Sequence, residues 1–473
     1  MKIKFLSIFL IIIFYFFPFP NLFCEIPQGF EVYFNNPTGT ADANSPGLDF
    51  RFKNYVDLAS DTTIYAAFYD INNSTVIAAL NSALNRGCMV YIISSSTGSG
   101  QPSEFAQIFT TNKIFRKENA SPQGLMHNKF CVIADSSVWT GSWNTTNNCT
   151  YQNNNNAIVI RSTAVAKIYE NEFLEMYNGS RFGSSKTLTT NNGKTEYVNG
   201  VKVKIYFSPY SSSVKGSETT NKAISNEIKG TNVISGAREK LYFCLFSFSS
   251  DDIRESILST MQRGVDVYGV FDITQADNNQ EYIALLSSGG YVVYHANPYS
   301  ITYNLHHKFG VIDPFTTNAK VITGSHNWSV SANENNDENT LIIYSTGIAK
   351  VYYEEFQKLY LQAGPVATPA KKAVSNIVVY PSPAKNKTTF GFELSSNVTS
   401  VTVKIYTLSG ELVKEIEITP PITPGVYNEI VWDCDNDDGE KVASGLYILK
   451  IEATTADKTF FVTEKFAVIK GEK

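Results

Sequence analysis

Cysteine and histidine are scarce in this chain, and their spacing excludes the common metal sites. The 473 residues include six cysteines and five histidines, and no pair of cysteines has the C-x-x-C spacing of zinc sites. No H-E-x-x-H segment occurs either. We therefore expect no metal ion and no other cofactor. The cysteines are predicted to be buried free thiols, with one disulfide bridge as the alternative.

An excess of charge of one sign is also lacking, because the formal net charge is only −5. A protein that binds nucleic acid along its surface usually has a basic face, so this balance argues against that class. It does not remove the class, since a local basic pocket would not change the total. Charged residues make up 18% of the chain and apolar residues 43%, which is typical of a globular protein without a long disordered span.

Long hydrophobic runs are absent except near the amino terminus. Residues 5–17 form one apolar run behind a short basic segment. The run is too short to span a bilayer comfortably and is typical of a secretory signal. We predict a signal peptide over residues 1–24 and a secreted or cell-surface protein of the bacterial export type. Lipid attachment at Cys24 is the alternative, which the large residues Leu22 and Phe23 disfavour.

The chain contains one unit written twice, between about residue 30 and residue 362. Each copy holds a histidine and a lysine two residues apart, His127 with Lys129 and His306 with Lys308. Successive side chains of a strand point to opposite faces, so the histidine and lysine of each pair project from the same face.

A Gly-Ser-x-Asn segment follows each pair and supplies Asn144 in the first copy and Asn327 in the second. Glycine lets the backbone approach closely, and the asparagine amide can donate hydrogen bonds. One imidazole, one ammonium and one carboxamide per copy, doubled, suit a phosphodiester. No metal is required by this arrangement.

The segments around these motifs alternate between strand and helix patterns. Dense apolar runs predict buried strands, and apolar residues at helical spacing followed by Arg-Gly predict helices with a glycine cap. The predicted strands are 31–37, 63–69, 89–93 and 156–160 in the first copy and 204–209, 240–246, 265–271 and 339–343 in the second, and the predicted helices are 75–85, 166–177, 251–262 and 349–360. This order predicts an α/β fold of mixed sheets flanked by helices.

Changes of composition divide the chain. A polar segment over 180–199 separates the two copies, and a Pro/Ala-rich linker precedes a region of short strands and turns that predicts an all-β domain. In that domain the acidic segment 433–440 has its glycine one place late for a calcium loop, so we predict a polar turn. The predicted division is signal peptide 1–24, first half 25–195, second half 196–362, linker 363–375 and all-β domain 376–473.

The second copy resembles the signature of the phospholipase D superfamily, H-x-K-x4-D followed by G-S-x-N. The match is complete, and Glu338 stands where that family carries a glutamate. The matching residues are His306, Lys308, Asp313, Gly324, Ser325 and Asn327.

The first copy resembles the same signature with departures. The residues in register are His127, Lys129, Ser142 and Asn144. The aspartate position falls on Ala134, with Asp135 one residue late, and the glutamate position falls on Asn155. These departures put the support of the first-half histidine in doubt, but not the groups that contact phosphate.

The resemblance implies two halves that form an internal pseudo-dimer within a monomer, with one site between them. Family precedent makes His127 the nucleophile and His306 the acid and base, and the reversed assignment stays open. The resemblance implies that Glu338 orients His306, whereas Asn155 offers His127 only a neutral carbonyl. The groups expected to neutralise the phosphate oxygens are Lys129, Lys308, Asn144 and Asn327.

Other residues near the motifs have weaker expectations. Ser142 and Ser325 are expected to bind substrate, and Asp135 and Asp313 to support the site structurally. The tryptophans beside the asparagines, Trp143 and Trp328, either rim a lipid-binding mouth or belong to the core, and the sequence favours neither.

The all-β domain resembles the immunoglobulin-like module related to FlgD and to the sorting domains of secreted bacterial proteins. The resemblance rests on residues 379–384, 404–406, 409–413, 432–433 and 443–447. It covers residues 376–470 and implies secretion or display on a surface.

The preferred function is a secreted phospholipase D-like phosphodiesterase that hydrolyses phospholipid head-group esters through a phosphohistidine, with a membrane surface as a candidate partner. A metal-independent endonuclease is the alternative enzyme, since the motif contacts phosphate and not what is attached to it. A catalytically weak, surface-displayed binding protein is the third hypothesis. The sequence leaves open the head group and the choice between hydrolysis and transfer to alcohols.

Overall fold

The described part of the chain covers most of both halves and of the all-β domain. The computed structural model describes residues 25–37, 47–95, 114–119, 124–186, 193–209, 219–230, 235–275, 279–295, 304–363, 374–394, 398–418, 427–455 and 459–469. The predicted signal peptide, Cys24 and most of the predicted linker lie outside these ranges. No helix in the described ranges is long and apolar enough to cross a membrane.

The first half, as far as it is described, is built on a seven-stranded mixed sheet. In spatial order its strands are β1 (Phe30–Phe34), β7 (Asn156–Arg161), β6 (Ser137–Gly141), β5 (Lys129–Ile133), β2 (Thr63–Phe68), β3 (Met89–Ser95) and β4 (Ile114–Asn119). Its helices are α1 (Leu48–Val56), α2 (Ser74–Asn85), α4 (Asn147–Tyr151) and α5 (Thr163–Gly179).

The second half repeats this arrangement in an eight-stranded sheet of the described residues. Its strands in spatial order are β12 (Tyr291–His295), β11 (Asp266–Asp272), β10 (Lys240–Leu245), β13 (Lys308–Ile312), β14 (Lys320–Gly324), β15 (Glu338–Tyr344), β9 (Val201–Ser208) and β8 (Lys194–Val198). Its helices are α6 (Thr220–Lys229), α7 (Asp251–Gln262), α8 (Gln280–Ser287), α9 (Val330–Glu334) and α10 (Thr346–Gln362), with short 3-10 turns η1 (Gly183–Ser185) and η2 (Ile273–Gln275).

The pairing of strands confirms the predicted mixed α/β fold. In the first half β2 runs parallel to β3 and antiparallel to β5, and in the second half β10 runs parallel to β11 and antiparallel to β13. The predicted glycine caps are present, because Gly87 and Gly264 have φ of +87° and +90°, a region that side chains avoid.

Several elements escaped the sequence patterns. The segment predicted as a polar joint, 180–199, contains η1 and the edge strand β8. The helices α1, α6 and α8 were also missed. The signal for α1 was present, because its buried apolar residues Leu48, Phe52, Tyr55 and Val56 have helical spacing.

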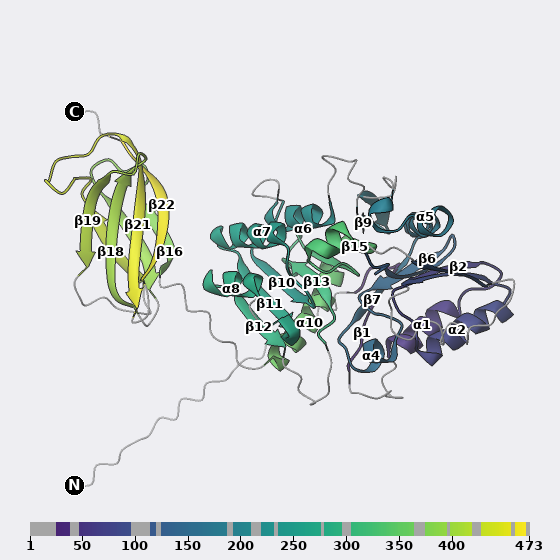
Figure 1. The fold of residues 1–473 in the computed structure, drawn as a ribbon. Helices are drawn as coiled ribbons and strands as arrows, with labels where there is room; N and C mark the ends of the chain where they lie inside the picture. The colour runs from purple at the N-terminus through teal and green to yellow at the C-terminus, as the bar shows by residue number, and fades with distance from the viewer. Residues whose placement is uncertain are drawn as a thin grey trace, which may run out of the picture.

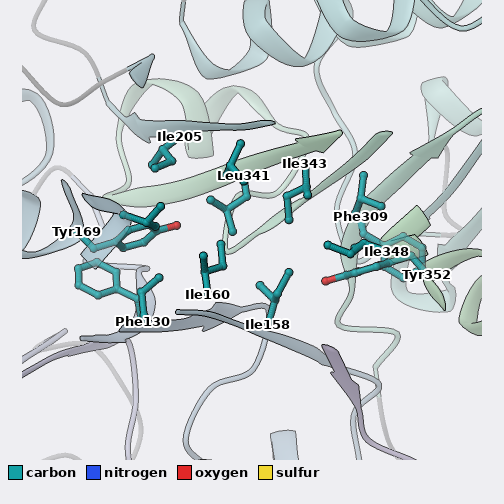
Figure 2. Packing of buried hydrophobic residues seen from close by; sticks show 14 of the residues in the cluster. Phe130, Ile158, Ile160, Tyr169, Ile205, Phe309, Leu341, Ile343, Ile348 and Tyr352 are labelled. Carbon is teal, nitrogen blue, oxygen red and sulfur yellow. The ribbon is translucent and has the colours of Figure 1, made fainter. Parts of the chain in front are cut away.

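The two halves share one apolar core. The outer faces of the two sheets pack on helix pairs, α1 with α2 and α6 with α7, whereas α5 and α10 cover the other faces (Figure 1). One buried cluster contains side chains of both β7 and β15, and Figure 2 shows Ile158 and Ile160 facing Leu341 and Ile343. The halves are therefore one packed body, as an internal pseudo-dimer requires.

The all-β domain consists, in its described residues, of two packed sheets with a core of its own. The strands are β16 (Val374–Tyr380), β17 (Thr388–Leu394) and β20 (Tyr427–Trp432) in one sheet, and β19 (Leu412–Ile418), β18 (Val398–Thr407), β21 (Gly445–Thr455) and β22 (Thr459–Val468) in the other. The acidic segment forms a turn in which Asn436 Oδ1 accepts the N–H groups of Asp438 and Glu440.

Candidate active site

His127 is held by a carboxylate from the other half of the molecule. It stands two residues before Lys129, the first residue of β5, and its Nδ1 lies 2.8 Å and 2.9 Å from the two carboxylate oxygens of Glu338 at the start of β15. Its backbone N–H donates to the carbonyl of Asp337, 3.0 Å away. Both the ring and the backbone of His127 are thus positioned by the second half.

His306 is held by an amide from the first half. Its Nδ1 lies 2.8 Å from Asn155 Oδ1, at the entry to β7. The expected partners were therefore wrong, because Glu338 supports His127 and Asn155 supports His306. Two isolated parallel β-bridges join the halves, one between Met126 and Asp337 and one between Asn154 and Leu305. They place the residues that lead into β15 beside His127 and the residues that lead into β7 beside His306, which explains the exchange.

Ser142 and Ser325 fasten these two supporting side chains. Ser325 Oγ donates to Glu338 Oε2 at 2.6 Å, and Ser142 Oγ donates to Asn155 Oδ1 at 3.0 Å. Each hydroxyl also accepts the backbone N–H of the next strand residue, Asn339 or Asn156. Both serines are fully buried, so the expected substrate contact is replaced by a contact with the groups that orient the histidines.

The glycines of the two Gly-Ser-x-Asn segments are required by close packing. Gly141 and Gly324 have φ of +152° and +145°. A Cβ added to them would lie 2.3 Å from Asn156 O and 2.2 Å from Asn339 O, well inside van der Waals contact. The absence of a side chain lets each serine reach the supporting residue.

Lys129 and Lys308 bring two ammonium groups into a nearly water-free site. Each is 1% exposed and donates to the carbonyl of its own histidine, at 2.7 Å and 3.0 Å. Burial lowers the pKa of Lys129 to about 8. Burial and then the charge of Lys129 lower the pKa of Lys308 to about 7, so the two cations lie close enough to repel each other. A bound phosphate anion would relieve this repulsion.

The surroundings disfavour the protonated form of both imidazoles. Burial first, and then the two lysines, hold the pKa of His127 and of His306 well below the usual range, and the two rings are 8% and 7% exposed. His127 itself also lowers the pKa of His306, which places the two rings in one electrostatic environment. Burial raises the pKa of Glu338 to about 7, against the charge of Lys129. A neutral imidazole has the free lone pair that a nucleophile or base needs.

Asn144 and Asn327 each have one polar end free of protein partners. Asn144 Nδ2 contacts the sulfur of Cys149 at 3.5 Å, whereas the Oδ1 atoms of both asparagines find no partner among the described residues. Rotation of an amide by 180° exchanges its oxygen and its NH2 group. Each side chain can therefore turn its NH2 group toward a phosphate oxygen and donate a hydrogen bond.

Two aromatic side chains of the site were missed from the sequence. The ring of Tyr69 lies 5.1 Å from that of His127, and the ring of Phe246 lies 5.0 Å from that of His306. Lys129 and Lys308 lie over the same two rings. The signal was present, because the strand patterns of the two copies align Tyr69 with Phe246 at their ends.

The remaining candidates have structural contacts. The carboxylate of Asp313 accepts the backbone N–H groups of Arg238, Glu239 and Lys240, which fixes the start of β10. Asp135 is exposed in a turn with φ of +53°, and its backbone carbonyl accepts the hydroxyl of Thr163, so the contact shown is with the start of α5 and not with the site.

The five described cysteines are buried and unpaired, and the described residues contain no group of three side chains suited to a metal ion. Trp143 and Trp328 are 1% exposed and pack in the two outer cores, so they belong to the core.

The fold and the site together define a class: two related α/β halves that bring paired histidines, lysines and asparagines into one buried cationic site. The sequence profile described as cardiolipin synthase, PLD-like domain, matches residues 54–177 and 231–360, more than half of the chain. The profile of the FlgD Ig-like domain matches residues 376–457.

Individual relatives agree with these matches. The mitochondrial cardiolipin hydrolases of Mus musculus and Homo sapiens are 35% and 36% identical over 129 residues, 27% of this chain and 55% and 48% of theirs. The chain thus spans about half the length of these relatives. The crystal structure of phosphatidylserine synthase from Haemophilus influenzae is similar in fold, with 14% identity, a TM-score of 0.50 and coverage of 72% of this chain and 88% of that one.

The chain belongs to the phospholipase D-like family, and it carries a FlgD Ig-like domain behind the two PLD-like segments.

Proposed function

We propose that this protein is a phosphodiesterase that hydrolyses phospholipid head-group esters through a phosphohistidine on His127. The observation that carries the proposal is the crossed support of the two histidines, with Glu338 on His127 and Asn155 on His306, beside Lys129 and Lys308. The carboxylate favours attack by His127, because it stabilises the positive charge that develops on that ring.

In the first step Nε2 of His127 forms a bond to phosphorus while the bond from phosphorus to the leaving oxygen breaks. Protonated His306 gives its Nε2 proton to that oxygen, which departs as an alcohol. The two lysines and the two asparagines bind the remaining phosphate oxygens, whose charge shifts during the transfer. Losing one such donor typically costs about 10²- to 10³-fold in rate.

In the second step water replaces the histidine. Neutral His306 takes a proton from the water at Nε2, the water oxygen bonds to phosphorus, and the bond between phosphorus and His127 breaks. The products are a phosphomonoester and the free enzyme, and His306 ends protonated for the next cycle.

The relatives described above are named cardiolipin hydrolases, which supports a phospholipid as the substrate. The partly exposed rings of Tyr69 and Phe246 beside the histidines offer apolar contacts to a lipid ester. We further propose secretion or surface display, supported by the amino-terminal apolar run and by the FlgD Ig-like domain.

The test uses the protein from residue 25 onward with a metal chelator, and vesicles of cardiolipin or phosphatidylcholine beside plasmid DNA. We expect release of the head group, and no release by His127→Ala or His306→Ala. Nicking of the plasmid without lipid cleavage would support the endonuclease instead. If the wild-type protein turns over neither substrate, the binding-protein hypothesis replaces the enzyme. Trapping of the phosphoryl group on His127 in samples quenched with alkali tests the covalent step, because a phosphohistidine is stable in alkali and labile in acid.

A further inference from the structure

The support of His306 is fixed in a way that only an amide satisfies. Asn155 is fully buried, and its Oδ1 faces His306 Nδ1 at 2.8 Å. Its Nδ2 donates to the carbonyls of Cys149 at 2.9 Å and Asn153 at 3.2 Å. The amide therefore cannot turn over without setting its oxygen against two carbonyl oxygens.

Further hydrogen bonds around Asn155 fix the same orientation of its amide. Its backbone N–H donates to Asn35 Oδ1 at 2.6 Å, and Asn35 Nδ2 donates in turn to the same two carbonyls. A carboxylate in place of the Asn155 amide would bring an anionic oxygen to these acceptors. The opposite support differs, since Glu338 Oε2 meets a hydroxyl donor of Ser325.

This arrangement separates the two tasks of His306. Because Asn155 Oδ1 can only accept, Nδ1 of His306 carries the hydrogen in the neutral ring and Nε2 keeps its lone pair. That tautomer is ready to take a proton from water. The imidazolium, in contrast, gains no counter-charge from its partner.

The other charged groups around His306 do not supply that counter-charge. Lys308 on β13, Lys129 on β5, and the rings of His127 and His307 all disfavour its protonation. The acidic groups in the same neighbourhood are Glu338 on β15 and Asp272 on β11, with the Cys149 thiol on α4, and they act on Lys308. Glu338 is engaged by His127, and Asp272 accepts the N–H of Leu305.

We propose that Asn155 keeps His306 mostly in its neutral form, so that departure of an alkyl leaving group, which needs the imidazolium, slows as the pH rises. Removal of the phosphoryl group by water needs the neutral ring and is not slowed in this way. Asn155 acts as a positioning residue through His306. The inference rests on the proposed phosphodiesterase activity and names the step that slows as the pH rises.

The test compares two diesters with the same phosphatidyl group, one with choline and one with p-nitrophenol as leaving group. Nitrophenolate departs without a proton, so the ratio of kcat/KM for the two substrates reports the acid step alone. Changes in lysine charge affect both substrates and cancel. We expect the aryl-to-alkyl ratio to rise about tenfold per pH unit between pH 6 and pH 8. A ratio that stays constant over this range overturns the inference.

A variant tests the role of Asn155 directly. In Asn155→Asp the added carboxylate favours the imidazolium, so the rise of the ratio should move upward by about one pH unit. Asn148→Asp, which adds the same charge at an exposed position of α4, should keep the wild-type curve.

A folded Asn155→Asp protein, checked by its thermal transition, with an unchanged ratio curve also overturns the inference. If Asn155→Asp does not fold, the wild-type ratio decides. Failure of the proposed function looks different, since neither diester would then be cleaved, or His127→Ala would remain active.

Discussion

At the scale of single residues, the site combines groups that are individually costly to bury. Lys308 is 1% exposed, and its pKa of about 7 lies far below that of a lysine in an unfolded chain, which is about 10.4. The unfolded chain therefore binds this proton more readily than the folded protein at every pH between these values. The charge of Lys308 consequently destabilises the fold, a cost that the proposed binding of a phosphate anion would explain.

Replacing Lys308 by methionine should stabilise the protein and abolish activity. The wild type loses stability as the pH falls from about 10 to about 7, so the gain of Lys308→Met is small near pH 10 and full below pH 7. We expect a gain of about 1–3 kcal/mol there, measured by thermal or urea unfolding at pH 6 and pH 9.5. Lys129→Met, whose lysine has a pKa of about 8, should gain less. A less stable Lys308→Met protein at pH 6 contradicts this account.

The serine of each Gly-Ser-x-Asn segment should affect catalysis without touching substrate. Ser325→Ala removes the donor to Glu338 and leaves the carboxylate free to shift away from His127. We expect kcat to fall about tenfold, or ~1.4 kcal/mol, with KM nearly unchanged. Ser142→Ala should alter the pH dependence set by His306 instead. A raised KM with normal kcat in Ser325→Ala would show instead that Ser325 contacts the substrate.

At the scale of elements, the turns between β6 and α4 and between β14 and α9 decide whether the site forms. Each turn begins with a glycine, Gly141 or Gly324, and because it has no side chain the following strand, β7 or β15, can pack closely against it. The start of that strand carries the residue that contacts the histidine of the other half. The predicted turn motif was therefore right in position, but its role is to join two strands to the opposite histidine.

Gly324→Ala should disrupt this junction. The new Cβ would lie 2.2 Å from Asn339 O, and φ is +145°, so both contact and backbone oppose it. We expect a loss of about 2–4 kcal/mol in the free energy of unfolding. Gly200→Ala is the matched control, because φ is +85° there but nothing lies within 4 Å, and its loss should be about 1 kcal/mol. Equal losses in the two variants would show that the contact is unimportant.

At the scale of the whole molecule, the two halves depend on each other and the all-β domain does not share their core. The buried cluster between the halves includes residues of β7, β15, α5 and α10, whereas the cluster of the all-β domain contains residues 374–468 alone. Catalysis should therefore require both halves and be independent of the last domain.

Ending the chain at Ala363 tests this independence. We expect kcat/KM for soluble short-chain substrates to stay within about twofold of the full chain, since the histidines, lysines and asparagines of the site and the residues that support them all lie before that point. A drop of tenfold or more with an unchanged thermal transition would show that the last domain takes part in catalysis.

The sequence alone predicted much of the fold and the identity of the paired side chains. The eight predicted strands of the two copies, the helices that end in Arg-Gly and the all-β character of the last domain follow from local periodicity, which a few neighbouring residues determine. α6 was missed because only Ala223, Ile224 and Ile228 of its ten residues are apolar, and α8 because its apolar residues 282–286 are consecutive and show no helical spacing.

Sequence by itself therefore determined that two histidines, two lysines and two asparagines would be presented on matching strands and turns. Only the tertiary structure decided which support meets which histidine. Glu338 and His127 are 211 residues apart, and Asn155 and His306 are 151 apart, so no local pattern relates them. The internal two-fold arrangement brings the start of β7 beside His306 and the start of β15 beside His127. That exchange leaves one histidine with a carboxylate and the other with an amide.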